Sequence, residues 1–288
     1  MCVSGGQRGE AMIGTIEGED GMQAAVALAG NKGYLELRRE RERPVVVALN
    51  RAHVTCTACT LRELCMGDGL DADALSEIDE LIANRARRHK GDTLFRTGDR
   101  FTSLYAIRSG SCKTISLGGD GHDQVAGYHM SGEIIGVDGI GNDRHEGQAV
   151  ALEDTEVCVL PFHRLEAYGR KNVRFQHNLH RLLSREIARQ AKVVLVLGTM
   201  LAERRLAVFL LDLGDRYHAR GYSSCEFVLR MTREEIGSYL GLKLETVSRL
   251  FSRFQRDGLL QVQGRIVKLL DRPVLRTIVA GDSIHGDS

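Results

Sequence analysis

Three cysteines near residue 60 have a spacing typical of metal ligands. Cys56, Cys59 and Cys65 form the pattern C-x2-C-x5-C. A short turn can bring the first two thiolates together, and the following residues can wrap the third around the same centre. A tetrahedral zinc or an iron–sulfur cluster would each need a fourth ligand. The spacing alone does not choose between them, because it matches neither the paired C-x2-C motifs of a zinc ribbon nor the ferredoxin run.

A second set of residues has the spacing of a surface that reads DNA. Glu245, Ser248 and Arg249 lie at positions i, i+3 and i+4, so a helix places them on one face. Arginine can donate two hydrogen bonds to guanine, and glutamate can accept one from the amino group of cytosine. Each good pair discriminates between bases by about 1 to 3 kcal/mol. These side chains therefore predict a helix that reads base edges in the major groove.

The reading face belongs to a predicted winged helix-turn-helix. Thr232 and Glu235 have the spacing of a capping box at the start of a first helix. Gly241 ends that helix after two turns, and the second helix follows within a few residues, which is the pattern of a helix-turn-helix. A small hairpin comes next along the chain. The two helices and the hairpin are predicted over residues 232–240, 244–255 and 259–269.

Basic residues are concentrated around this motif. The whole chain has a net charge of only +1, so any electrostatic attraction to DNA must be local. Between residues 230 and 256 there are six basic side chains and three acidic ones. Some of these basic groups are predicted to contact phosphates, which positions the motif without reading sequence. The candidates are Arg230, Arg233, Arg253 and Arg256.

The segments before the motif have clear but different patterns. Residues 1–50 are rich in Gly, Glu and Arg and are predicted to be a mobile extension. Apolar residues recur at helical spacing over residues 71–88, which predicts one amphipathic helix. Between residues 91 and 161, short apolar runs alternate with glycines, which predicts an antiparallel sandwich or barrel-like roll.

A long helix is predicted over residues 173–201, followed by a shorter one over residues 203–219. The long helix carries a single apolar stripe, so it needs a partner surface. That surface could be its own roll, but we favour the same helix of a second copy, which makes the protein a homodimer. The predicted seam consists of Leu179, Leu183, Ile187, Val194, Leu197 and Leu201.

Composition excludes several classes of protein. With 43% hydrophobic and 27% charged residues in 288, the chain is an ordinary globular protein of more than one domain. No apolar run is long enough to span a membrane and no secretion signal is present, which predicts a cytoplasmic protein. The sequence has no nucleophile elbow, Walker loop or HExxH motif, so we do not expect an enzyme.

Taken together, these features resemble a known family. The cysteine triplet, the glycine-rich roll, the long helix and the segment 241–250 resemble the oxygen-sensing FNR branch of the catabolite-activator (CRP/FNR) superfamily of transcription regulators. The resemblance covers roughly residues 50–275. It implies an α+β fold, with an N-terminal antiparallel β-roll of the cyclic-nucleotide-binding type, a long dimerisation helix and a C-terminal winged helix-turn-helix. The corresponding domain bounds are 1–50, 51–170, 171–201 and 202–288.

The resemblance also implies a cofactor. Family members hold an oxygen-labile [4Fe-4S] cluster with three N-terminal cysteines and a fourth in the roll. The segment 156–162 resembles the fourth-ligand segment, which implies Cys158 as the fourth ligand, with Cys112 as the rival. An intact cluster would favour the dimer and DNA binding, and oxygen would reverse both. A structural zinc, or a haem or nitric-oxide sensor on the same scaffold, is the alternative.

The family's partners are likewise implied. The reading face would recognise TTGAT-type half-sites in palindromic double-stranded DNA, and the turn 118–123 resembles the family's contact with RNA polymerase. Lys243 stands where the family usually has a capping threonine, so the cap is weaker, but a lysine there could reach a phosphate. Cyclic-nucleotide-binding relatives carry an Arg-Ser pair where this chain has His145 and Glu146. A glutamate would repel a phosphate, so no cyclic nucleotide is expected.

Overall fold

The computed structural model describes residues 15–17, 23–28, 34–37, 45–48, 55–118 and 123–281. The chain divides into two compact units, residues 1–54 and 55–288, and each is described by itself. No described helix combines the length and the apolar character that crossing a membrane would require.

The first unit contains a small antiparallel sheet. Its four strands pair in sequence order, each with the next one along the chain. The sequence analysis predicted a mobile extension here and no strands, because each strand is short and the surrounding residues show little periodicity. The strands are β1 (Thr15–Glu17), β2 (Gln23–Leu28), β3 (Tyr34–Leu37) and β4 (Val45–Ala48).

The second unit begins with the cysteine loop and α1 (Ala72–Leu81). The Asp71 side chain caps α1 by accepting a hydrogen bond from the backbone N–H of Ala74 (2.9 Å). The prediction of a single helix over residues 71–88 was wrong at its end. Residues 84–88 form strand β5 (Asn84–Arg88), because their backbone pairs with a strand from the far end of the roll.

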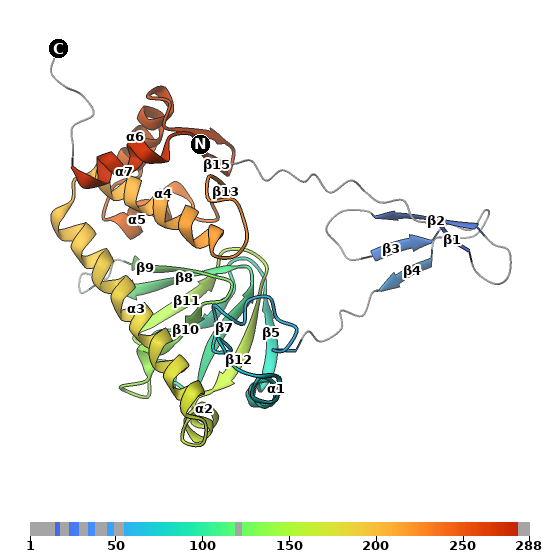
Figure 1. The fold of residues 1–288 in the computed structure, drawn as a ribbon. Coiled ribbons are helices and arrows are strands. Elements are labelled where there is room, and N and C mark those ends of the chain that lie inside the picture. Colours follow the sequence, from blue (N-terminus) through green and yellow to red (C-terminus); the bar gives the residue numbers. More distant parts are fainter. Residues whose placement is uncertain are drawn as a thin grey trace, which may run out of the picture. The chain divides into compact units, whose positions relative to one another are not determined.

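The roll is built from two four-stranded sheets, in the orders β10-β7-β12-β5 and β6-β11-β8-β9 (Figure 1). All the pairings are antiparallel, as the short runs separated by glycines predicted. The remaining elements are β6 (Thr93–Phe95), β7 (Ser103–Ser109), β8 (Ser111–Leu117), β9 (Asp123–Met130), β10 (Ile134–Ile135), the 3-10 turn η1 (Val137–Gly139), β11 (Gly147–Ala151) and β12 (Thr155–Pro161).

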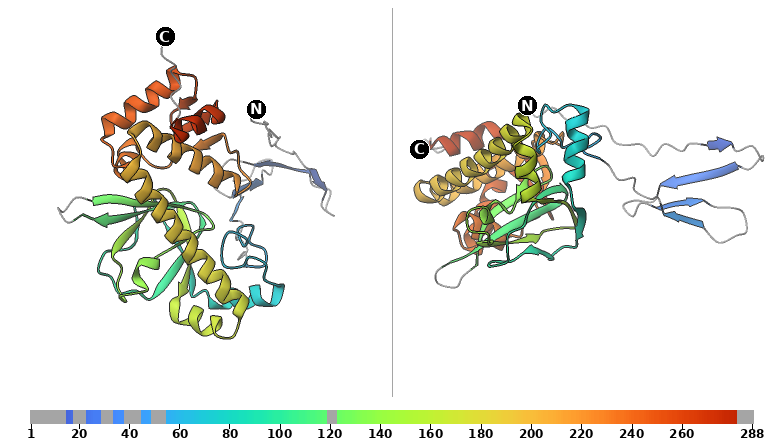
Figure 2. Two further views of the ribbon diagram at one scale, coloured as in Figure 1. Left: turned by 60° about the vertical axis from the view of Figure 1, so that its left-hand side comes forward. Right: turned by 90° about the horizontal axis from the view of Figure 1, so that it is seen from below.

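Helices follow the roll. The short α2 (Phe162–Gly169) leads into the long α3 (Val173–Thr199), which runs beside the roll to α4 (Ala202–His218) in every view (Figures 1 and 2). The DNA-binding motif comprises α5 (Arg233–Leu240), α6 (Leu244–Arg256) and the wing strands β14 (Leu260–Gln263) and β15 (Ile266–Leu269). Strand β13 (Glu226–Val228) adds to the wing, and α7 (Arg272–Ala280) packs on α4.

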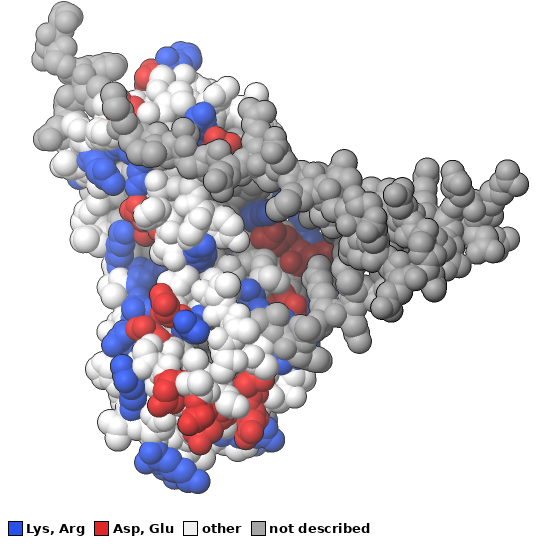
Figure 3. Space-filling model, turned by 45° about the vertical axis from the view of Figure 1, so that its right-hand side comes forward, with Lys and Arg blue, Asp and Glu red and all other residues white. Residues whose placement is uncertain are grey.

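One hydrophobic core joins the roll to the DNA-binding motif. Tyr128 and Met130 on β9 are buried in the same cluster as Leu206, Leu210 and Ile236 of the helices. A second cluster packs the start of α3 and the cysteine loop against the roll. Charged side chains gather in separate places on the face in Figure 3, with acidic groups near its lower end and basic groups along its left edge.

Candidate metal centre and nucleic-acid interface

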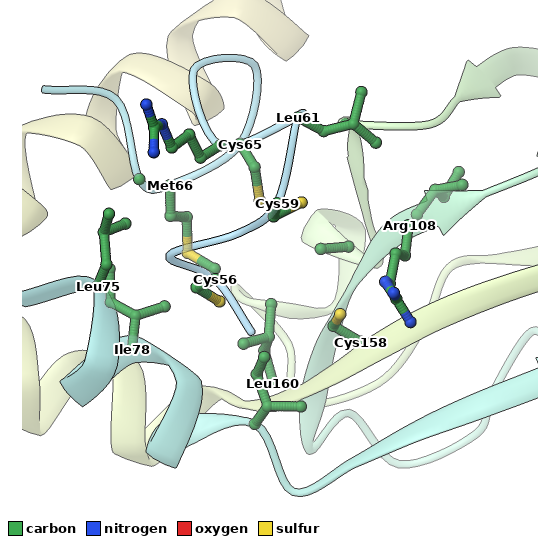
Figure 4. A pocket seen from close by; sticks show the side chains of 16 residues that line it. Cys56, Cys59, Leu61, Cys65, Met66, Leu75, Ile78, Arg108, Cys158 and Leu160 are labelled. Atoms are coloured by element: carbon green, nitrogen blue, oxygen red, sulfur yellow. The ribbon is translucent and has the colours of Figure 1, made fainter. Parts of the chain in front are cut away.

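The four cysteines named from the sequence line one cavity of about 60 Å³ (Figure 4). Cys56, Cys59 and Cys65 come from the loop before α1, and Cys158 comes from β12, so two distant segments supply the thiols. The rest of the wall is mainly apolar. It includes Leu61, Met66, Leu75, Ile78, Ile82, Ala106, Ile107 and Leu160.

Backbone turns wind the loop so that the thiols gather. The N–H of Cys59 donates to the carbonyl of Cys56 (3.3 Å), and the N–H of Cys65 donates to the carbonyl of Leu61 (3.0 Å). The buried amide of Asn178 on α3 donates to the loop carbonyls of Met66 (3.1 Å) and Asp68 (2.7 Å). The loop is therefore fixed to the long helix as well as to the roll.

Burial raises the pKa of three of these thiols, those of Cys56, Cys65 and Cys158. It raises the pKa of Cys65 to about 12. Burial also raises the pKa of Cys56, and the Asp79 carboxylate adds to that effect. At Cys158, burial raises the pKa while Arg85 and Arg108 oppose it. Because metals bind thiolates, a bound cation must displace these protons.

Cys112, the rival for the fourth position, lies elsewhere. Its side chain is fully buried on β8, in a core cluster with Phe95, Ile107 and Ala149, and it does not line the cavity. Among the described residues, no three Cys, His, Asp or Glu side chains are arranged to hold a single metal ion. The four thiols surround a space instead of converging on one point.

The reading face of α6 is open to solvent. Glu245, Ser248 and Arg249 are exposed. Within the described part of the chain, no ion pair involves Glu245 or Arg249. Lys243 is also exposed and makes no capping hydrogen bond, as the sequence predicted. The groups named for base contacts are therefore free to meet a partner.

Three of the four predicted phosphate contacts are engaged within the chain. Arg230 pairs with Glu153 (3.1 Å). The guanidinium of Arg233 stacks on the ring of Phe251, 3.2 Å from its centroid, and burial lowers its pKa to about 10. Arg253 forms ion pairs with Glu203 and Asp257. To contact DNA, each side chain would have to leave these partners.

The first helix of the motif is fixed at both ends. The predicted capping box is present: the N–H of Glu235 donates to the Thr232 hydroxyl (3.1 Å), and the N–H of Thr232 donates to the Glu235 carboxylate (2.7 Å). Glu235 also pairs with Lys113 on β8 (2.6 Å), which ties α5 to the roll. At Gly237 a Cβ atom would lie 2.6 Å from the carbonyl oxygen of Leu242, so the tight turn between the helices requires glycine there.

Helix α3 has one face that is covered by its own roll and another that is exposed to solvent. Leu179 is buried against its own roll, and Leu183 and Leu197 are half-buried, so these three do not need a second copy to cover them. Ile187 and Val194 are 70% and 71% exposed and lie seven residues apart on α3, whereas Leu201, which is 77% exposed, lies beyond the last residue of that helix, Thr199. The exposed part of the predicted seam on α3, Ile187 and Val194, is thus a short heptad stripe, which fits a helix that pairs with another.

The position that corresponds to the Arg-Ser pair of cyclic-nucleotide-binding relatives is occupied by side chains of this protein itself. The carboxylate of Asp138 accepts hydrogen bonds from the N–H groups of Glu146 (2.9 Å) and Gly147 (3.2 Å). His145 is buried and stacks on Phe95 with ring centroids 3.8 Å apart. The backbone amides that could bind an anion at this position therefore already bind the Asp138 carboxylate.

A charged cluster that sequence reasoning missed connects three elements. Glu133, between β9 and β10, accepts hydrogen bonds from Arg189 on α3, from Arg216 on α4 and from Arg220, just after the end of α4. Nothing in the local sequence reveals it, because the partners lie more than fifty residues away along the chain.

Comparisons with known proteins agree with this architecture. Residues 86–172 match the cyclic nucleotide-binding domain family, and residues 204–278 match the Crp-like helix-turn-helix domain family. The "Transcriptional regulatory protein btr" of Bordetella pertussis is 44% identical over 84% of this chain and 99% of its own length. The "Fumarate and nitrate reduction regulatory protein" of Salmonella typhimurium is 39% identical over 78% of this chain and 90% of its own.

The fold comparison points the same way. The solved structure of FixK2 from Bradyrhizobium japonicum has a TM-score of 0.64 and 28% identity, and the match covers 72% of this chain and all of that one. These relatives are regulators that carry a DNA-binding motif, and they are not enzymes. This chain therefore belongs to the FNR branch of the CRP/FNR family of DNA-binding transcription regulators.

Proposed function

We propose that this regulator senses oxygen through a [4Fe-4S] cluster bound by Cys56, Cys59, Cys65 and Cys158, and controls anaerobic gene expression. The observation that carries the proposal is that all four thiols, from two distant segments, line one small cavity with apolar walls. Thiolates are the usual ligands of iron–sulfur clusters. Apolar surroundings limit access of solvent and so influence cluster stability. The donor set and its environment therefore fit the group.

The alternatives fit less well. Zinc in a structural site needs its four ligands at one point, whereas these thiols surround a space and no described group is arranged for a single ion. Haem needs a much larger pocket, since small-molecule sites are roughly 300–1,000 Å³. The cavity here is about 60 Å³.

When bound, the cluster supplies an iron centre that reacts with oxygen. The chain's own residues connect that site to DNA. Shared ligation would hold the cysteine loop against β12, and Asn178 ties the same loop to α3. The heptad stripe of α3 would then pair with that of a second copy. Loss of ligation in air would free the loop and weaken the pairing, which lowers DNA affinity through linkage.

Pairing explains the form of the expected DNA site. A dimer presents two α6 helices to half-sites about 34–36 Å apart, one turn of the double helix, so a palindrome of TTGAT-type half-sites is expected. Glu245, Ser248 and Arg249 would read the bases. Lys243, Arg233 and Arg253 would contact phosphates. Contact with RNA polymerase through the turn 118–123 also stays a prediction, because residues 119–122 lie outside the described part of the chain.

A cyclic nucleotide is not expected to be a ligand. The Asp138 carboxylate occupies the amides of Glu146 and Gly147 and would repel a phosphate at that position. The signal would therefore enter through the cysteine cavity.

The proposal is tested by purifying the full chain without oxygen and measuring its absorption spectrum, iron and acid-labile sulfide before and after exposure to air. We expect a brown protein with about four irons and four sulfides per chain that bleaches in air as its DNA affinity falls. A colourless, zinc-loaded protein that binds the same DNA equally well in air would overturn oxygen sensing. An intense Soret band would identify haem instead.

Replacement of Arg249 by alanine tests the reading face. We expect a loss of about 1 to 3 kcal/mol for a TTGAT palindrome, roughly 5- to 150-fold in Kd, because a bidentate contact to guanine is removed. Fluorescence anisotropy of labelled DNA at fixed salt measures this. The control is Arg256→Ala at the exposed end of α6, which should weaken binding to the palindrome and to scrambled DNA by similar factors. Equal effects of Arg249→Ala on both DNAs would contradict base reading.

A further inference from the structure

A largely buried arginine lies beside the proposed fourth ligand. Arg85 on β5 is directly opposite Cys158 on β12 in the antiparallel ladder. Its side chain is only 13% exposed. An ionised side chain is costly to bury without partners, so the groups around Arg85 should account for its charge and its five N–H donors.

One of these donors is used in a hydrogen bond that links Arg85 to the cysteine loop through Asp79. One Nη of Arg85 donates to Oδ1 of Asp79 on α1 (2.5 Å), and the same oxygen accepts a hydrogen bond from the backbone N–H of Cys56 (3.0 Å). Asp79 and Arg85 thus join the loop that carries three thiols to the strand pair that carries the fourth.

One N–H donor of Arg85 is not accounted for by these contacts. The Nε atom of Arg85 is buried and has no hydrogen-bond partner among the described residues. An unsatisfied buried donor destabilises the folded state, and more so when the group is charged. The residue directly opposite Arg85 in the ladder is Cys158, whose thiol would become a thiolate, a strong acceptor, on binding iron.

The two arginines that line the cavity itself have other partners. Arg108 lines the cavity but pairs with Glu156 (2.7 Å). Arg62 also lines it but is exposed and donates to the carbonyl of Thr57 (3.2 Å). Four thiolates and Asp79 would place several negative charges around one apolar space, so an N–H donor aimed at sulfur has a clear electrostatic role there.

We propose that Arg85 is a positioning residue of this site, which donates to the Cys158 thiolate while Asp79 couples it to the Cys56 segment. The inference rests on the proposed function, since it needs a thiolate-bound group in the cavity. Arg85 would hold the two ligand segments in register and stabilise the ligating form of Cys158. Its loss should therefore speed the escape of iron even when no oxygen is present.

The test measures iron release from the full-length, anaerobically loaded protein to a coloured ferrous chelator. We expect Arg85→Gln to release iron at least fivefold faster than the unmodified chain, with a changed visible spectrum. Arg85→Lys keeps the charge but lacks the planar fork that reaches Asp79 and sulfur together, so it should restore the rate only in part. The matched control is Arg87→Gln, an exposed arginine on the same strand, which should behave like the unmodified chain.

A second variant separates this role from a general effect on folding. Asp79→Asn keeps the side-chain shape and weakens the same link, so it should also speed release. Release is measured without urea, where urea unfolding curves of the metal-free Arg85 and Asp79 variants show that both are folded. If the unmodified chain holds no iron, both the proposed function and this inference are overturned. If it holds iron and Arg85→Gln releases it at the unmodified rate, the inference alone is overturned.

Discussion

Replacing Glu133 with alanine is expected to lower the free energy of unfolding by about 2 to 4 kcal/mol. Breaking a fully buried ion pair costs roughly 3 to 5 kcal/mol because the remaining charge loses its partner. Glu133 is 24% exposed, at the wall of a cavity of about 520 Å³, so some solvent access reduces that figure. The substitution would leave three guanidinium groups, those of Arg189, Arg216 and Arg220, without their shared carboxylate.

Urea unfolding of the metal-free protein measures this change. The control is Glu226→Ala, which removes an exposed pair with Lys268 (3.8 Å) and should cost less than about 1 kcal/mol. Similar losses for the two variants would show that the Glu133 cluster adds nothing beyond a surface ion pair.

The same cluster predicts a pH dependence. Burial alone would raise the pKa of Glu133, but Arg216, Arg189 and Arg220 lower it to about 2. The unfolded value is about 4.3. A lowered pKa stabilises the folded state above the unfolded pKa, and that stabilisation is lost as the pH falls toward the folded pKa. The difference in stability between the unmodified chain and Glu133→Gln should therefore be constant above about pH 5 and shrink toward pH 2.

Replacing Cys158 with serine should abolish cluster binding, while the same change at Cys112 should not. A [4Fe-4S] cluster uses four thiolates, and Cys158 supplies the fourth thiol of the cavity. Iron per anaerobically loaded chain should fall from about four to near none in the Cys158 variant. Cys112→Ser should keep its iron but lose about 1 to 3 kcal/mol of stability, because a hydroxyl is placed in an apolar core. The opposite pattern of iron loss would make Cys112 the ligand.

The sequence was most informative where a signal is local. The capping box at Thr232 and Glu235, the glycine at the motif's turn and the glycine-separated strands of the roll all lie within a few residues of what they specify. The N-terminus of α7 had such signals too: Asp271 caps it and Pro273 follows in the first turn.

Non-local contacts account for what was missed. The segment Asn84–Arg88 is rich in arginine and follows a helix, so its own residues favour continuing that helix. Pairing with β12, seventy residues later, makes it a strand. At the candidate site, the spacing of Cys56, Cys59 and Cys65 was visible, but the Asp79–Arg85 link and the Glu133 cluster depend on tertiary contacts. The covered side of α3 likewise depends on the roll, which is why Leu179 was assigned to the dimer seam.

Helix α3 can be regarded as a lever with two attachment points. Asn178 holds the cysteine loop and Arg189 holds Glu133, eleven residues and about 16 Å further along the axis. An α-helix of three turns does not shorten, because each residue is fixed by its hydrogen bond to the next turn. A displacement of Asn178 along the axis therefore reaches Arg189 undiminished, and Glu133 shares its carboxylate with Arg216 of α4 and with Arg220, which follows that helix. The distance between the cysteine loop and the Glu133 cluster is spanned by one rigid element, with no hinge between its attachment points.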